Sequence, residues 1–220
     1  MFSFFRKPKT WKRYFDEGMA YGQASDFAKA EASFRDAIRL APTEPYPHYE
    51  LGYTLSLMGR YREALEELRR TDELNRGFFL VQTEAYMCEL LLSGVIDVEV
   101  LKLLRVLQRL TDSGASHSEQ ATTVSRRVIE LAPECALGHF HLGKALLESE
   151  PAAAERALRR CVEMHPDDTT AIDAKFHIGV LRRQAGQEAE ARRIWHRIVA
   201  DYPGNPHVKF AEMSAGQESA

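Results

Sequence analysis

The side chains in this sequence that could carry out chemistry are few and widely spaced. Cys135 and His139 lie four residues apart, which would put two metal ligands on one helix face if the helix began that early. His141 follows only two residues later and points to a different face. His48 and His177 are expected near the same face as these two histidines. A pair of ligands without a third does not make a zinc site, so we expect no metal and no cofactor.

Catalytic motifs are absent from the sequence. It contains no GxSxG, HExxH, phosphate-binding or dinucleotide-binding motif, and its Asp, Glu and His residues can be assigned to caps, turns or helix surfaces. The 3 cysteines are odd in number and have no CxxC spacing. Two of them, Cys88 and Cys161, fall on apolar helix faces, where a small thiol packs well. We therefore predict neither an enzyme nor a structural disulfide.

Length and charge narrow the possible partners. The chain has 220 residues and a formal charge of −3, which gives no general attraction to nucleic acid or to an anionic membrane. No apolar run is long enough to span a bilayer. The first residues, MFSFFRKPKTW, place apolar side chains before basic ones, the reverse of a secretory signal, so a cytoplasmic protein is expected. Their phenylalanines either cover the first helix or touch a membrane surface weakly, without stable insertion.

One phrase ends an apolar helical stretch at four places. Its copies are IRLAP, IELAP, VEMHP and IVADYP, and each closes on a proline, which forces its predecessor out of the α region and stops the helix. Three of these stretches also place an alanine four residues before a large apolar residue, and a fifth copy, which lacks the proline, does the same at Ala64/Leu68. The four copies end at Pro42, Pro133, Pro166 and Pro203, and the pairs within them are Ala30/Phe34, Ala154/Leu158 and Ala191/Trp195.

The repeat has a period of about 34 residues. Gly18 aligns with Gly52 and Phe34 with Leu68 at this spacing, and Gly143 and Gly179 occupy the matching positions further on. Where two helices cross closely, a side chain larger than Gly or Ala would push their axes beyond the usual separation. Small residues on one helix opposite large ones on the next therefore predict a hairpin of two helices that stacks on copies of itself.

The motif LGxxL/Y, followed by AxxxF/L/W and a terminal proline, resembles the tetratricopeptide repeat family. The resemblance covers residues 11–75 and 136–204. It implies an all-α fold, an α-solenoid of antiparallel helical hairpins wound as a right-handed superhelix. We expect about five repeats, one unpaired helix and a short C-terminal capping helix.

The expected organisation has five parts. A tail covers residues 1–10, two repeat units cover 11–78, a degenerate unit with an extra helix covers 79–132, two further units cover 133–204, and a capping helix with a tail covers 205–220.

The middle part contains an odd number of predicted helices. Either Val81–Leu92 or Ser116–Leu131 is unpaired, and both alternatives remain open from the sequence. The second of these helices is expected to begin with a capping box from Ser116 to Glu119. The linker Thr111–Ala115 is the expected hinge.

The resemblance implies binding rather than catalysis, and the first helix of each unit lines the inner surface. We predict a non-enzymatic protein–protein interaction scaffold or adaptor that holds a partner peptide or helix in this concave groove. The alternatives are a self-assembling homo-oligomer or a regulatory subunit of a larger complex, and the same side chains could instead pack between repeats. The predicted contact residues are Phe15, Met19, Tyr49, Tyr53, Phe140 and Phe176.

Adjacent arginines recur on the second helices of the units. Because they are interleaved with glutamates, a solvated outer face explains them, and a patch for an acidic partner is the alternative. The pairs are Arg69-Arg70, Arg126-Arg127, Arg159-Arg160 and Arg192-Arg193.

Overall fold

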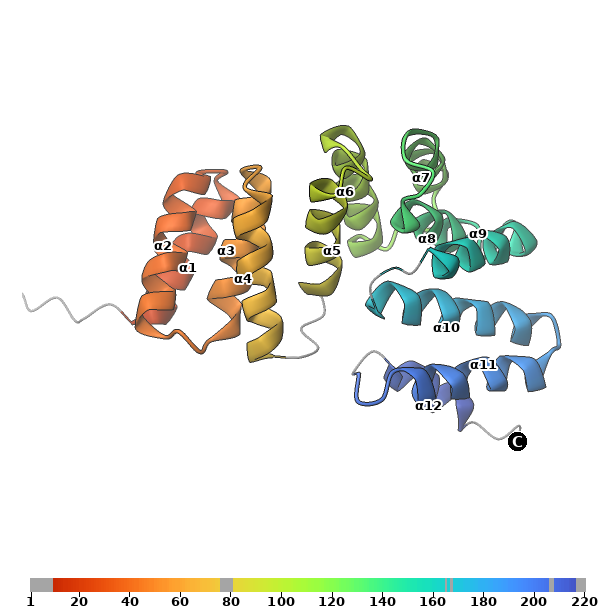
Figure 1. Cartoon of the computed structure of the whole chain (residues 1–220). Helices are drawn as coiled ribbons and strands as arrows, with labels where there is room; N and C mark the ends of the chain where they lie inside the picture. The colour runs from red at the N-terminus through yellow and green to blue at the C-terminus, as the bar shows by residue number, and fades with distance from the viewer. Residues whose placement is uncertain (1–9, 76–80, 165, 167, 206–207, 217–220) are drawn as a thin grey trace, which may run out of the picture. The chain divides into compact units, whose positions relative to one another are not determined.

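The computed structural model describes residues 10–75, 81–164, 166, 168–205 and 208–216. These residues form 12 helices and no strand, so the fold is all-α (Figure 1). No described helix is both long and apolar enough to cross a bilayer. The phenylalanine-rich segment at residues 2–9, Pro206 and the last four residues lie outside the described part of the chain.

The helices follow one another through short turns. Their bounds are α1 (Trp11–Gln23), α2 (Phe27–Leu40), α3 (Pro45–Leu57), α4 (Tyr61–Leu74), α5 (Val81–Leu92), α6 (Val98–Asp112), α7 (Glu119–Leu131), α8 (Ala136–Ala145), α9 (Pro151–Glu163), α10 (Asp168–Gln184), α11 (Glu188–Asp201) and α12 (Lys209–Ala215).

The chain divides into two compact units, Met1–Cys88 and Glu89–Ala220. In the first unit α1 packs on α2 and α3 on α4, while α2 contacts α3 and the first helices α1 and α3 touch. The second unit repeats this order from α6 to α11, with α12 packed on α11. Each hairpin therefore buries its apolar stripe against its own partner helix and against the next hairpin.

The structure assigns the helices of the middle segment. α6 packs on α7, and α7 contacts α8 in the way that α2 contacts α3, so α6 and α7 form a hairpin. The remaining helix of this segment, α5, packs its Val81, Ala85 and Cys88 against the core of the first unit. The predicted hinge at Thr111–Ala115 is instead the tight turn of the α6–α7 hairpin, where Gly114 has a φ of 76°.

The α6–α7 hairpin distributes its side-chain volume differently from the others. Eight residues before the terminal proline, where α2 has Phe34, α7 has the small and fully buried Ser125. The large buried residues lie on α6, at Leu104 and Leu107. Because small and large residues have exchanged helices, the sequence motif is missing although the hairpin forms.

One helix start differs from the sequence-based expectation. α7 begins at Glu119, and its cap is Ser118 rather than Ser116, since the Ser118 hydroxyl accepts a hydrogen bond from the Ala121 N–H at 3.1 Å. α12 begins at Lys209, and the expected first position of this helix, Pro206, lies outside the described residues.

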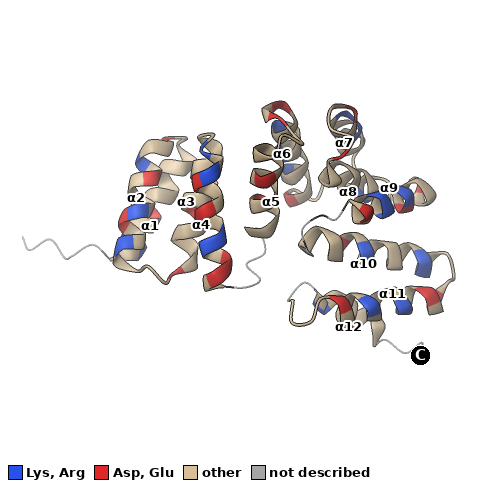
Figure 2. Ribbon diagram, in the orientation of Figure 1, with Lys and Arg blue, Asp and Glu red and all other residues tan. Residues whose placement is uncertain are grey.

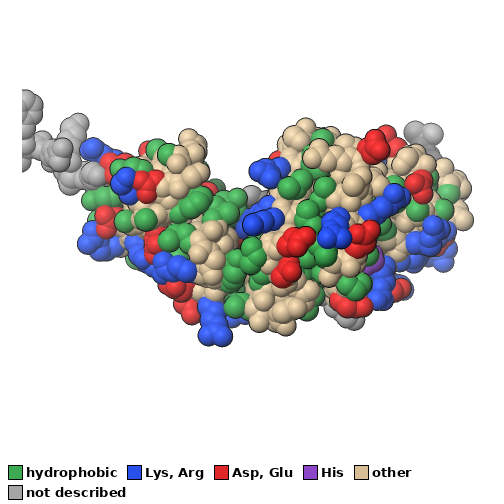
Figure 3. Space-filling model, turned by 90° about the horizontal axis from the view of Figure 1, so that it is seen from above, with side chains coloured by type: hydrophobic (Ala, Val, Ile, Leu, Met, Phe, Trp, Pro, Cys, Tyr) green, Lys and Arg blue, Asp and Glu red, His purple; other side chains and the backbone are tan. Residues whose placement is uncertain are grey.

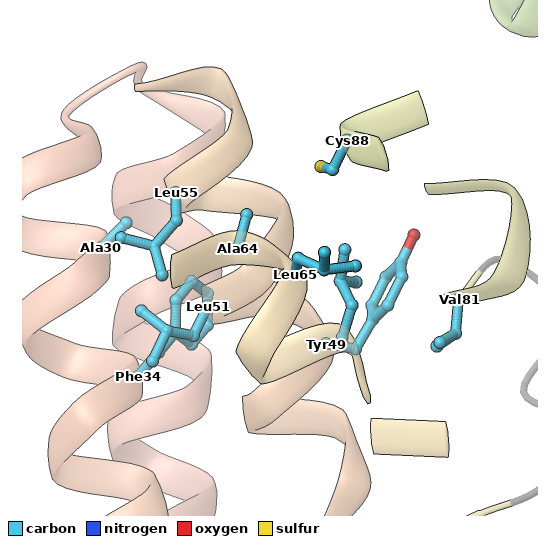
Figure 4. Close-up of a cluster of buried hydrophobic side chains, with 10 residues drawn as sticks. Ala30, Phe34, Tyr49, Leu51, Leu55, Ala64, Leu65, Val81 and Cys88 are labelled. Atoms are coloured by element: carbon cyan, nitrogen blue, oxygen red, sulfur yellow. The ribbon is translucent and has the colours of Figure 1, made fainter. Parts of the chain in front are cut away.

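Glycines on the first helices let the paired helices approach closely. A Cβ atom added at Gly18 would lie 2.6 Å from Phe34, and one added at Gly143 would lie 2.5 Å from Leu158. Neither distance is compatible with a methyl group, so the large side chain of the second helix rests on bare backbone. Figure 4 shows the resulting core of the first unit, with Phe34, Leu51 and Leu55 gathered between α2 and α3.

A pair of glycines in α1 provides a matched test of this packing. Gly18→Ala forces the Phe34 ring to move, and we expect it to lower the free energy of unfolding by ~1–3 kcal/mol. Gly22→Ala meets no atom within 4 Å and is expected to be neutral or stabilising by up to ~1 kcal/mol, because alanine favours the helix. Urea unfolding followed by circular dichroism measures both, and equal effects would contradict this account of Gly18.

Candidate interaction surface

In the first unit, the predicted contact residues lie on α1 and α3 and differ in how far they are covered. Phe15 is half-buried, and its ring centroid lies 5.9 Å from that of Phe34. Met19 is also half-buried and packs against the same core. Tyr49 is only 9% exposed and belongs to the core, while Tyr53 stacks on it with centroids 6.5 Å apart. Phe15, Met19 and Tyr53 therefore retain surface that a partner could contact.

In the second unit, the predicted residues are Phe140 on α8 and Phe176 on α10. Phe140 is 8% exposed and forms part of the core between α8 and its neighbours. Phe176 is half-buried and lies 6.1 Å from the Trp195 ring, whose indole N–H donates to the Phe176 carbonyl at 3.3 Å. Most of Phe140 is thus committed to packing, and Phe176 is the more accessible ring.

One more aromatic residue lies beside Phe176, and it was not predicted from the sequence. Phe210 on α12 is 69% exposed, and its ring centroid lies 6.3 Å from that of Phe176. It follows Phe176 by the same 34 residues that separate Phe15 from Tyr49. The 34-residue period, extended into the capping helix, would therefore have predicted an aromatic residue at Phe210.

Basic side chains lie beside these rings in the second unit. The Lys144 ammonium is 5.3 Å from the centroid of the Phe140 ring, and no carboxylate among the described residues pairs with it. Burial lowers the pKa of His141 to about 3 and that of His177 to about 4, and the charge of Lys144 acts in the same direction on both. Both imidazoles are thus neutral at physiological pH.

The other two histidines of the predicted group have a different role. His48 Nε2 donates to the Pro42 carbonyl, and His139 Nε2 donates to the Pro133 carbonyl, each at 3.1 Å. Each histidine follows its proline by six residues, so this hydrogen bond joins each first helix to the turn after the preceding helix. His48 and His139 therefore each have a structural role within their own unit.

Comparison with known proteins identifies the chain. Models of the tetratricopeptide repeat match residues 12–44, 33–66 and 173–205. The chain belongs to the tetratricopeptide repeat family. Members of this family generally act as protein-interaction scaffolds without enzymatic activity of their own. The three matched ranges include neither the α6–α7 hairpin nor the α8–α9 hairpin.

Solved structures of similar proteins include other members of the family. YrrB, described as a tetratricopeptide repeat protein with an unusual peptide-binding site, is 14% identical, with 91% of each chain covered and a TM-score of 0.42. A thermophilic member from Thermus thermophilus is 20% identical, with 94% of this chain and 98% of that chain covered and a TM-score of 0.40. The TPR2AB domain of yeast Sti1, solved in complex with pHSP90, is 15% identical, with coverage of 94% and 85% and a TM-score of 0.45. No curated protein matches the sequence significantly.

The described residues of this tetratricopeptide repeat protein contain no group of three potential metal ligands. Cys135 precedes α8 and is buried, which raises the pKa of its thiol, and His139 is engaged with Pro133. All three cysteines are buried, and none of them forms a disulfide. Cys135 and His139 therefore do not form a metal site, and Lys144 remains available for contact beside the Phe140 ring.

The two buried imidazoles predict how the stability of this tetratricopeptide repeat protein depends on pH. Below about pH 6.5 the unfolded chain takes up protons at His141 and His177 that the folded chain does not. Stability is therefore full above pH 6.5 and falls as the pH approaches 4. We expect the urea midpoint of a His141→Gln/His177→Gln variant to fall less than that of wild type between about pH 7.5 and pH 5.

The exposed His196 provides the control for this measurement. The His196→Gln variant should keep the pH slope of the wild-type protein. If the double variant and the wild type show the same slope, the burial of the neutral imidazoles does not govern acid sensitivity.

Proposed function

We propose that this protein is an adaptor that binds a segment of a partner protein on the surface formed by its first helices. The observation that carries the proposal is the exposure of Phe210 in line with Phe176, at the position of the repeat that holds an aromatic ring elsewhere. An aromatic ring exposed to this extent costs solvation free energy unless a partner covers it. The half-buried Phe15, Met19 and Tyr53 offer an equivalent surface on the first unit.

The chemistry of the surface favours recognition of a peptide without a covalent step. Rings such as Phe176 and Phe210 bury apolar area with little loss of rotamer entropy, which is typical of binding hot spots. Lys144 and the neighbouring histidines add donors that fix the orientation of a bound segment. Three buried thiols without a disulfide agree with a reducing compartment, so we place the protein in the cytoplasm.

Truncation of Phe210 tests the proposal. Because its side chain supports little of the folded core, Phe210→Ala should keep the melting temperature close to that of wild type while weakening partner binding by ~10-fold or more. Affinity purification from the native cell with quantitative mass spectrometry compares the proteins retained by each bait. Leu40→Ala, which removes a half-exposed side chain from the second helix α2, is the matched control. Equal retention by wild type, Phe210→Ala and Leu40→Ala would contradict a role for the first-helix surface.

A second candidate function is self-association through the C-terminal end. Its support is that α12 exposes Met213 as well as Phe210, at 57% and 69%. If two copies bury this pair, light scattering will give a mass that rises with concentration for wild type but stays monomeric for Phe210→Ala/Met213→Ala. A wild-type mass of about 25 kDa at all concentrations would exclude self-association as the role of these side chains.

A further inference from the structure

The recurring pairs of adjacent arginines lie on the second helices α4, α7, α9 and α11. In the second unit, shallow grooves run between successive second helices, with a first helix as the floor between them. Arg159 lines the groove formed by α9, α10 and α11, whereas its neighbour Arg160 lines the groove formed by α7, α8 and α9. The two members of one pair therefore serve two grooves, and Arg126 and Arg193 line the far sides.

The groove between α9 and α11 is the larger of the two. Its volume is about 560 Å³, compared with about 390 Å³ for its neighbour. Aliphatic side chains from all three helices line it, with Val162 on α9, Ile178 on α10 and Ile194 on α11. It therefore has room for several apolar side chains of a ligand.

The charges around this groove are unequal. Four cationic side chains line it, at Arg159, Lys175, Arg193 and Arg197, against two carboxylates at Glu163 and Glu190. Both carboxylates already face arginines of this chain, Glu163 at 3.5 Å from Arg160 and Glu190 at 3.7 Å from Arg182. Of the cations, Arg159 pairs with Glu155 at 2.7 Å and Lys175 with Asp201 at 3.4 Å.

The remaining two cations, Arg193 and Arg197, lie four residues apart on α11 and flank Ile194. Arg193 donates through Nε only to the Ala189 carbonyl of its own helix, at 3.3 Å. Within the described part of the chain, no carboxylate lies within ion-pair distance of either guanidinium. On α4, by contrast, blue and red residues lie next to one another, as Figure 2 shows.

We propose that the groove between α9 and α11 binds an acidic, amphipathic segment of a partner protein. The aliphatic floor takes the apolar side chains of that segment, and the Arg193 and Arg197 guanidiniums take carboxylates, which they can bind through two parallel hydrogen bonds. Since neither Phe176 nor Phe210 lines this groove, the site does not use the aromatic residues of the proposed function.

The lining of the groove favours a protein over a nucleic acid. No aromatic ring is among the described residues that line it, so bases would have no stacking platform. Glu163 and Glu190 would repel a continuous phosphate backbone, whereas isolated carboxylates can avoid them. On the face seen in Figure 3, acidic and basic side chains are interspersed with hydrophobic ones.

A display library of random peptides, panned on the full chain, is the probe. We expect the enriched peptides to combine acidic with aliphatic residues and to bind the Arg193→Glu/Arg197→Glu variant at least ~10-fold more weakly in fluorescence anisotropy. The Arg193→Gln/Arg197→Gln variant should show an intermediate loss. Because both arginines are exposed, circular dichroism should show that each variant keeps the wild-type melting temperature, and the glutamine variant decides the question if the glutamate variant does not fold.

The control variant is Arg62→Glu/Arg109→Glu, which makes the same charge change at two exposed arginines outside the groove. It should bind the selected peptides as wild type does. The proposal is overturned if no peptide is enriched, if the peptides lack acidic residues, or if the Arg193/Arg197 variants bind them unchanged. Peptides lost on Phe210→Ala but kept on the Arg193/Arg197 variants would support the first-helix surface and reject this groove. Stronger binding of polyuridylate than of any peptide would reject the choice of a protein partner.

Discussion

The fold depends on one steric relation, a glycine on a first helix facing a large side chain on the second. Gly18 faces Phe34 and Gly143 faces Leu158 at distances that leave no space for a methyl group. This contact sets the separation of the paired helices, and therefore how far each first helix projects toward the next hairpin. The surfaces available for binding are what remains once these contacts are satisfied, on the outward sides of the first helices and in the grooves between the second helices.

Local signals made most of the helical hairpins predictable from the sequence. Prolines end the helices, and the alanine and glycine positions recur at a constant period, so the order of helices and their bounds follow from residues close together in the chain. The pairing of α6 with α7 could not be predicted, because Ser125 occupies the position of a large residue and the compensating volume lies on α6. Which middle helix is additional depends on tertiary packing, and the sequence carries no local signal for it.

The candidate site was predictable in position but not in exposure. The repeat register placed Tyr49 and Phe140 on first helices, yet both are almost covered because neighbouring helices close over them. Phe210 has the same register and stays exposed because no helix follows α12 among the described residues. The histidines likewise occupy similar positions in the repeats but make different contacts. His48 and His139 donate hydrogen bonds to proline carbonyls. His141 and His177 lie beside aromatic rings. The exposure of a side chain and the contacts it makes depend on several helices at once, so the sequence period alone does not predict them.

The glycines in the hairpin turns have a consequence for how the chain folds. Gly59 and Gly186 adopt φ values of 78° and 77°, a conformation that reverses the chain within a few residues. Each hairpin therefore closes a short loop, and the entropy lost on closing it does not grow with the number of hairpins. A chain built in this way makes most of its contacts between neighbours in sequence, which favours rapid folding from several starting points. Hairpins could accordingly be added or lost during evolution without slowing the folding of those that remain.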